Sequence, residues 1–142
     1  KYQLTDLGAC LLLDSMKEYE LIKSHRNSIY KTYVKNIIQN EKIKCVQAVD
    51  KNAKEVMWLF TIISRYKDII QKKLREKNIE TNQVHFRNDK YSIFKKFSKN
   101  KTFKNMDKLQ DKYLVLPMHT KMTINDAKRV SFEINKIIKE LN

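Results

Sequence analysis

The chain contains one glycine and one proline in 142 residues, and this scarcity of turn-forming residues limits the folds open to it. Glycine adopts positive φ angles without steric cost, and proline presets φ at the first corner of a turn. A chain that lacks both must place asparagine in its tight turns or consist mainly of helices with few turns. We therefore expect long helices and expect Asn78 to end one of them in the left-handed conformation.

The length corresponds to a single domain with one core, and the charge balance is strongly basic. Thirty Lys and Arg residues against 16 Asp and Glu residues give a net charge of +14. Such a charge attracts nucleic acid, anionic membranes or nucleotide phosphates. The lysines are, however, spread along the chain among Asn and Ile, a compositional habit that needs no polyanionic partner. No apolar run reaches the roughly 18 residues that a membrane-spanning helix requires, so we expect a soluble protein.

The two cysteines, Cys10 and Cys45, are isolated in the sequence. Neither has the CxxC or histidine spacing of a metal site, so no metal is expected. Unpaired cysteines without a signal peptide favour a reducing compartment, and we expect the cytoplasm. The sequence begins without Met and inside a helical pattern, which favours a piece of a longer polypeptide.

A helical pattern runs from about Thr5 to about Gln39, either straight or kinked, and Thr5 or Asp6 can cap its start. The first part of this helix is almost wholly apolar, which predicts a surface covered by other protein. The apolar residues are Leu7, Ala9, Cys10, Leu11, Leu12, Leu13 and Met16. We assign residues 1–40 to a long connecting helix and residues 41–142 to a small α/β domain.

The small domain is predicted to hold strands and helices in alternation. An outer strand at 43–49, a buried central strand at 56–63 and further strands at 79–86 and 113–116 follow from apolar periodicity. Helices are predicted at 65–77, near 91–97, near 106–113 and after a capping box formed by Thr123 and Asp126. The fold class is α/β of the α+β kind, a long helix feeding a small mixed or antiparallel sheet with helices packed on it.

Polar residues follow two of the predicted strands, in the stretches 83–91 and 115–123, where ligands commonly meet a sheet. His85 and Arg87 are two residues apart on a strand, so their side chains point to the same face. An imidazole and a guanidinium on one face suit a phosphate or pyrophosphate. The alternatives are an exposed edge-strand pair, or an Arg87 that pairs with Asp89. His119 fits either a functional or a structural role.

These two stretches, with residues 1–9, resemble the C-terminal part of DegT-type pyridoxal-phosphate-dependent nucleotide-sugar aminotransferases. The order of segments matches: a Tyr-containing turn, an Ala-containing helix, Ser24-His25-Arg26, Trp58-Leu59-Phe60, Glu80 to Asp89, and Leu116-Pro117-Met118-His119 before a last helix. The resemblance covers essentially all 142 residues. It implies the linking helix and small C-terminal domain of a type I transferase, which a larger cofactor-holding domain precedes.

The resemblance implies an enzyme that moves an amino group from an amino-acid donor to a nucleotide-linked keto-sugar, as a homodimer. The lysine that forms the Schiff base lies upstream of Lys1 in the family. Pyridoxal phosphate is therefore expected to be bound mainly by the missing domain, and this piece alone is expected to hold no catalytic residue and to be inactive. Lys1 stands where the family contacts the cofactor phosphate of the neighbouring subunit. His85 and Arg87, with Asn88, are expected to contact the phosphates or sugar of the substrate.

Two functions of other classes fit parts of the sequence. A non-enzymatic basic module would bind RNA or DNA through the lysines and phenylalanines of residues 94–104. An interaction scaffold would use the apolar opening of the first helix to bind a partner. We expect no membrane partner.

Overall fold

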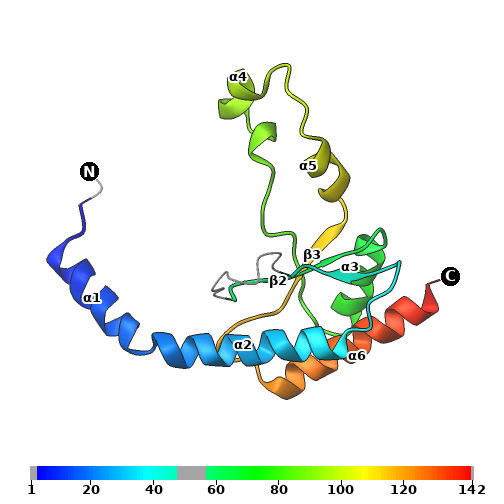
Figure 1. Ribbon diagram of the computed structural model, residues 1–142, viewed down its shortest axis with the longest axis horizontal. Coiled ribbons are helices and arrows are strands. Elements are labelled where there is room, and N and C mark those ends of the chain that lie inside the picture. The colour runs from blue at the N-terminus through cyan, green and yellow to red at the C-terminus, as the bar shows by residue number, and fades with distance from the viewer. Residues whose placement is uncertain (1–2, 48–56, 142) are drawn as a thin grey trace.

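The computed structural model describes residues 3–47 and 57–141, and its elements are labelled in Figure 1. The predicted long helix is two helices, α1 (Asp6–Lys17) and α2 (Tyr19–Asn36), which meet at Glu18. Thr5 caps the first of them, because its side-chain oxygen accepts from the backbone N–H of Gly8 at 3.1 Å. The kinked form of the predicted helix is therefore the observed one.

Three short strands form an antiparallel sheet in the order β1-β2-β3. They are β1 (Lys44–Cys45), β2 (Phe60–Ile63) and β3 (Tyr113–Leu116). The central strand β2 pairs with both neighbours, Phe60 lying opposite Leu116 and Ile63 opposite both Lys44 and Tyr113. The predicted sheet is thus confirmed as antiparallel, although its strands are shorter than expected. The predicted positions 48–49 and 56 lie outside the described residues.

The predicted strand at 79–86 is wrong. This segment joins the sheet through a single bridge between Asn82 and Val115, whose backbone groups exchange hydrogen bonds of 3.2 and 2.8 Å. In the register set by Asn82 and Val115, residues 85 and 86 would pair with residues 112 and 111, but those residues form a turn after helix α5 (Lys104–Leu109). An apolar alternation without a partner strand leaves the backbone unpaired, so the segment departs from the sheet.

The remaining elements follow the predicted pattern closely. They are helix α3 (Lys67–Glu76), the 3-10 turns η1 (Asn88–Lys90) and η2 (Ser92–Phe94), helix α4 (Lys95–Ser98) and helix α6 (Ile124–Glu140). Among the described residues the two with positive φ are Asn78 at 56° and Asn100 at 63°. Asparagine therefore takes the left-handed turns, as the shortage of glycine predicts.

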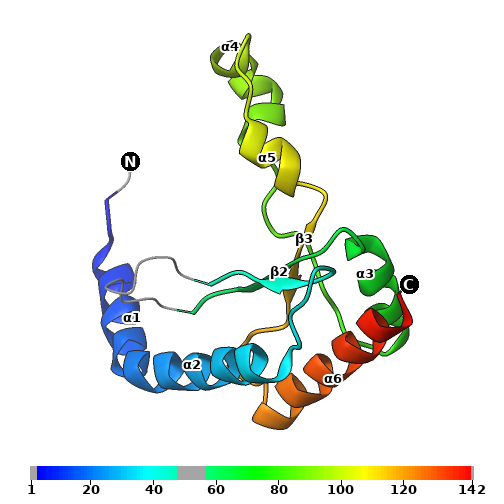
Figure 2. The same ribbon diagram turned by 45° about the vertical axis from the view of Figure 1, so that its right-hand side comes forward.

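The core lies between the sheet and helices α2, α3 and α6, and Figure 2 shows α2 and α6 below the strands. Phe60 of β2 is fully buried and its ring lies 4.7 Å from that of Tyr33 on α2. The Tyr33 hydroxyl donates to the carbonyl oxygen of Pro117 at 2.8 Å. Burial raises the pKa of this hydroxyl above its ordinary value, and the charge of Asp126 adds to the effect. Helix α2 is therefore part of the folded body.

Two parts of the chain project from this body (Figure 1). Helix α1 has no buried residue, and its large apolar side chains, such as Leu7 at 72% exposure, face solvent. Residues 83–112, here called the arm, leave the sheet and return to β3. None of the helices in residues 3–47 and 57–141 has both the length and the apolarity needed to cross a membrane.

The N-terminal caps of helices α1 and α6 should contribute unequally to the free energy of unfolding. Thr123 accepts from the backbone N–H of Asp126 at 3.1 Å at the start of α6, a helix with six buried residues. We expect Thr123→Ala to lower the free energy of unfolding by about 1 kcal/mol. Thr5→Ala, the matched control, removes the cap of a helix that buries nothing, and should leave the urea midpoint unchanged. Equal losses in both variants would contradict the division into body and projecting helix.

Candidate functional site

The base of the arm is held by a buried arginine. Within residues 83–112, all of which the structure describes, Arg87 is the one buried residue, at 6% exposure. Its Nε and Nη2 donate to the two carboxylate oxygens of Asp89 at 2.8 and 2.7 Å. Its Nη1 donates to Asp107 at 2.5 Å and to the amide oxygen of Gln110 at 3.2 Å. Arg87 therefore links the outgoing chain of the arm to helix α5 on its return.

The electrostatics of this cluster favour the ionised forms. Hydrogen bonds to Asp89 and then to Asp107 raise the pKa of the Arg87 guanidinium above its usual value. The reciprocal hydrogen bond from Arg87 lowers the pKa of the Asp89 carboxyl. Charge-assisted bidentate pairs of this kind are among the stronger and more directional side-chain contacts. The cluster therefore stays paired across the physiological pH range.

The predicted face shared by His85 and Arg87 is not formed, because the segment that carries them is not a strand. Arg87 points into the arm and pairs with Asp89. This pairing is the alternative to phosphate binding that the sequence analysis gives for Arg87. His85 is exposed, and its ring lies edge-on to that of Trp58 at 5.9 Å. Its carbonyl oxygen accepts a hydrogen bond from the hydroxyl of Tyr113. Asn88 is exposed at the start of η1.

An aromatic pocket of about 520 Å³ opens inside the arm. Its floor includes Arg87, Asn88 and Asp89, and its walls come from η2, α4, the following loop and α5. The wall residues are Phe94, Phe97, Ser98, Lys101, Phe103 and Met106. This volume lies within the range of small-molecule sites, about 300–1,000 Å³. Two of the residues predicted to bind substrate, Arg87 and Asn88, thus lie together in one pocket, whereas His85 is not among its lining residues.

The arm is also the most basic projection of the chain. Residues 83–112 hold nine Lys and Arg against three Asp, a net charge of +6. The lysines are exposed, and the ammonium group of Lys96 lies 4.9 Å from the centroid of the Phe97 ring. Positive charge beside exposed aromatic rings suits an anion that carries a planar group.

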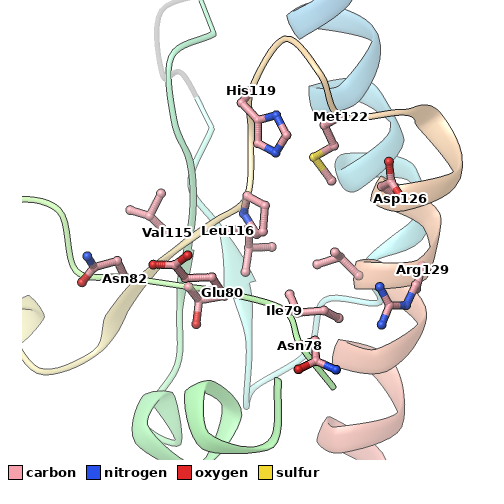
Figure 3. A pocket seen from close by; sticks show the side chains of 13 residues that line it. Asn78, Ile79, Glu80, Asn82, Val115, Leu116, His119, Met122, Asp126 and Arg129 are labelled. Atoms are coloured by element: carbon pink, nitrogen blue, oxygen red, sulfur yellow. The ribbon is translucent and has the colours of Figure 1, made fainter. Parts of the chain in front are cut away.

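A second groove, of about 450 Å³, lies beside the Pro117 segment (Figure 3). His119 and Asn82 line it from the sheet side, and Asp126 and Arg129 line it from α6. The pKa of Asp126 is lowered by its hydrogen bonds with Thr123, which form the capping box, and Arg129 donates to the carbonyl oxygen of Lys77 at 2.7 Å. Asp126 and Arg129 are thus engaged in holding α6, which favours a structural role for that side of the groove.

Sequence reasoning missed the role of Arg26. Its Nη1 donates to the carbonyl oxygens of Met57, Trp58 and Met118 at 3.2, 2.9 and 3.4 Å. One guanidinium therefore joins α2 to the start of β2 and to the segment after β3. Because the acceptors are backbone oxygens far along the chain, no local pattern reveals the contact. Its effect is to fix the backbone that carries Trp58 beside His85.

Few charged or polar residues of the described part of the chain are buried. The buried charged or polar residues among them are Ser64, Thr81, Arg87 and Ser131, so none of the described lysines is buried. A lysine that forms a Schiff base needs a desolvated setting to lower its pKa. Lys1, predicted to contact the cofactor phosphate, lies outside the described residues. Within residues 3–47 and 57–141 no cluster of three metal-ligating side chains occurs.

The sequence matches the model of the DegT/DnrJ/EryC1/StrS aminotransferase family over residues 1–135. Among curated proteins none matches significantly. The family match confirms the resemblance seen in the sequence, and it gives no support to a nucleic-acid-binding module.

Solved structures share the fold. AtS13 from Actinomadura melliaura has a TM-score of 0.85 and 18% identity, and the match covers 96% of this chain and 36% of that one. DesV from S. venezuelae, in complex with a ketimine intermediate, has a TM-score of 0.82 and 16% identity, covering 95% and 37%. PseC from Helicobacter pylori, an aminotransferase involved in the biosynthesis of pseudoaminic acid, has a TM-score of 0.77 and 17% identity, covering 91% and 36%.

These similarities confirm the predicted fold class, a small α/β body with a long helical entry like that of pyridoxal-phosphate-dependent aminotransferases. The chain spans about a third of the length of the solved structures it matches. With a family match over nearly the whole sequence and a fold shared with several sugar aminotransferases, this chain belongs to the DegT/DnrJ/EryC1/StrS aminotransferase family.

Proposed function

We propose that this chain is the small C-terminal part of a cytoplasmic aminotransferase that acts on a nucleotide-linked keto-sugar. Residues 1–40 form the connecting helix in this proposal and residues 41–142 form the small domain. The chain contributes substrate contacts and dimer surface, and the reactive lysine belongs to polypeptide outside it. The observation that carries the proposal is the family match over residues 1–135, on a chain with about a third of the length of matching structures.

The proposed cofactor is pyridoxal phosphate, bound mainly by the larger domain. When bound, it carries the amino group between the amino-acid donor and the keto-sugar. The role of this chain in the reaction is then to bind and orient the substrate. In the proposal Lys1 adds a point charge near the cofactor phosphate.

We assign the substrate contacts of the small domain to the segment at the base of the arm. His85 and Asn88 are exposed there, and the ring of Trp58 packs against His85. Arg87 has four of its five N–H groups engaged by Asp89, Asp107 and Gln110. We therefore infer that Arg87 holds His85 and Asn88 in position, and that these two residues contact the phosphates or sugar.

Removal of the contacts should change substrate binding more than turnover. In the complete enzyme, His85→Ala and Asn88→Ala should each raise the KM for the nucleotide keto-sugar roughly tenfold, because each removes one polar contact to a charged ligand. The expected change in kcat is small, since neither residue is assigned a proton-transfer role. His119→Ala, which alters a histidine of the separate Pro117 groove, is the matched control. A KM that stays at the wild-type value in both substituted enzymes would refute these contacts.

This 142-residue chain alone should form no absorbing complex with pyridoxal phosphate and should not transaminate. The reason is that the proposal assigns the reactive lysine to polypeptide outside these residues. Titration of the cofactor into the chain, followed by visible absorbance, measures this directly. The same chain joined to its family-typical larger domain is the positive control and should bind cofactor and turn over. A stable visible band from the chain alone would contradict the proposal.

The homodimer is proposed from the exposed apolar side chains of α1. Leu7, Leu11, Leu12 and Leu13 are each more than half exposed, at 72, 63, 53 and 65%. An apolar surface of this extent is typical of an interface. In the complete enzyme Leu11→Glu should weaken the dimer, and sedimentation velocity would detect monomer at concentrations where the wild type is dimeric. Phe132→Glu, a change at an exposed apolar residue on α6, is the control. Unchanged sedimentation of Leu11→Glu would remove α1 from the dimer surface.

A further inference from the structure

We propose that the aromatic pocket of the arm holds the base of a nucleoside diphosphate, with the arm lysines around the diphosphate. The inference rests on the proposed function and deepens it, because it assigns the nucleotide part of the substrate to particular residues. Phe97 and Phe103 are the base-contacting residues. Lys101 and its neighbours bind the phosphates.

The first argument is the composition of the pocket walls. Three phenylalanines and a methionine line a cavity of about 520 Å³, and all four side chains are partly exposed, from 37% for Phe103 to 60% for Phe97. Aromatic rings left exposed around a cavity offer flat surfaces on which a base can stack. Alanine substitution at such positions typically reduces binding about tenfold.

The second argument is the arrangement of charge. Lys101 lines the pocket, and the ammonium group of Lys96 lies over the Phe97 ring. Lys95, Lys99 and Lys104 are exposed on the same short stretch of chain. The Arg87 charge is compensated by Asp89 and Asp107, so Lys101 and Lys96 supply the positive charge placed at the pocket. An apolar pocket with ammonium groups beside it fits a ligand with a flat apolar part and an anionic tail.

The third argument is the attachment of the pocket to the body. The contacts of Arg87 with Asp89 and Asp107 join the two sides of the arm below the cavity. The hydroxyl of Tyr113 in β3 donates to the carbonyl oxygen of His85. The pocket is thereby connected to the segment with the proposed sugar and phosphate contacts. A nucleotide-linked sugar has its base and its sugar at opposite ends of a diphosphate, which suits two adjoining contact regions.

Calorimetry on the 142-residue chain tests the proposal, with uridine diphosphate, guanosine diphosphate and inorganic pyrophosphate as probes at low salt. At least one nucleoside diphosphate should bind about tenfold more tightly than pyrophosphate. Phe97→Ala and Phe103→Ala should each weaken nucleotide binding roughly tenfold and leave pyrophosphate binding unchanged. Lys101→Glu should weaken binding of nucleotide and pyrophosphate alike, and rising salt should do the same.

Phe132→Ala, which removes a 65%-exposed phenylalanine on α6, is the matched control and should bind like the wild type. Because Trp58 is the one tryptophan of the chain, its fluorescence during urea unfolding verifies that each variant is folded. Absence of nucleotide binding at millimolar concentration, equal affinity for pyrophosphate and nucleotide, or wild-type affinity of both phenylalanine variants would each overturn the proposal. The complete enzyme distinguishes this proposal from the proposed function. If it transaminates a nucleotide keto-sugar and its Phe97→Ala variant has an unchanged KM, the proposed function stands and the assignment of this pocket is wrong.

Discussion

The packing of α2 against α6 beneath β2 forms the centre of the core, and the positions of the other elements depend on it. Phe60 of β2 is fully buried against Tyr33 of α2, and the Tyr33 hydroxyl donates to the carbonyl oxygen of Pro117. All large apolar groups that these helices bury are directed to this one layer. Three short strands cannot cover more surface, so the first helix and the arm are left outside the core. Both projections keep apolar side chains exposed, and both are the parts to which we assign contacts.

The elements that sequence reasoning predicted well depend on neighbours in the chain. The cap at Thr5, the capping box of Thr123 and Asp126, and the left-handed turn at Asn78 are local, because each involves residues at most a few positions apart. The bend at Glu18 was one of two forms that the apolar pattern allowed. Local preferences therefore account for most helix boundaries.

The predictions that failed depend on partners far along the chain. Residues 79–86 alternate like a strand, but the chain before Tyr113 is helix and turn, and supplies no further ladder. Arg87 turns inward because Asp107, twenty positions away, joins Asp89 in binding it. Arg26 donates to backbone carbonyl oxygens that are more than thirty positions away. Periodicity reports which face of an element is apolar and does not identify a distant partner.

We propose that the reactive lysine lies in polypeptide outside this chain and that the chain itself binds substrate. The family match and the shared fold establish the kind of protein, and the position of the reactive amine is part of the proposal. The most direct measurement is to load the complete enzyme with pyridoxal phosphate, reduce it with borohydride and locate the modified lysine by peptide mass spectrometry. We predict that the modified lysine lies in the polypeptide before these 142 residues. A cofactor trapped on any lysine within them would contradict it.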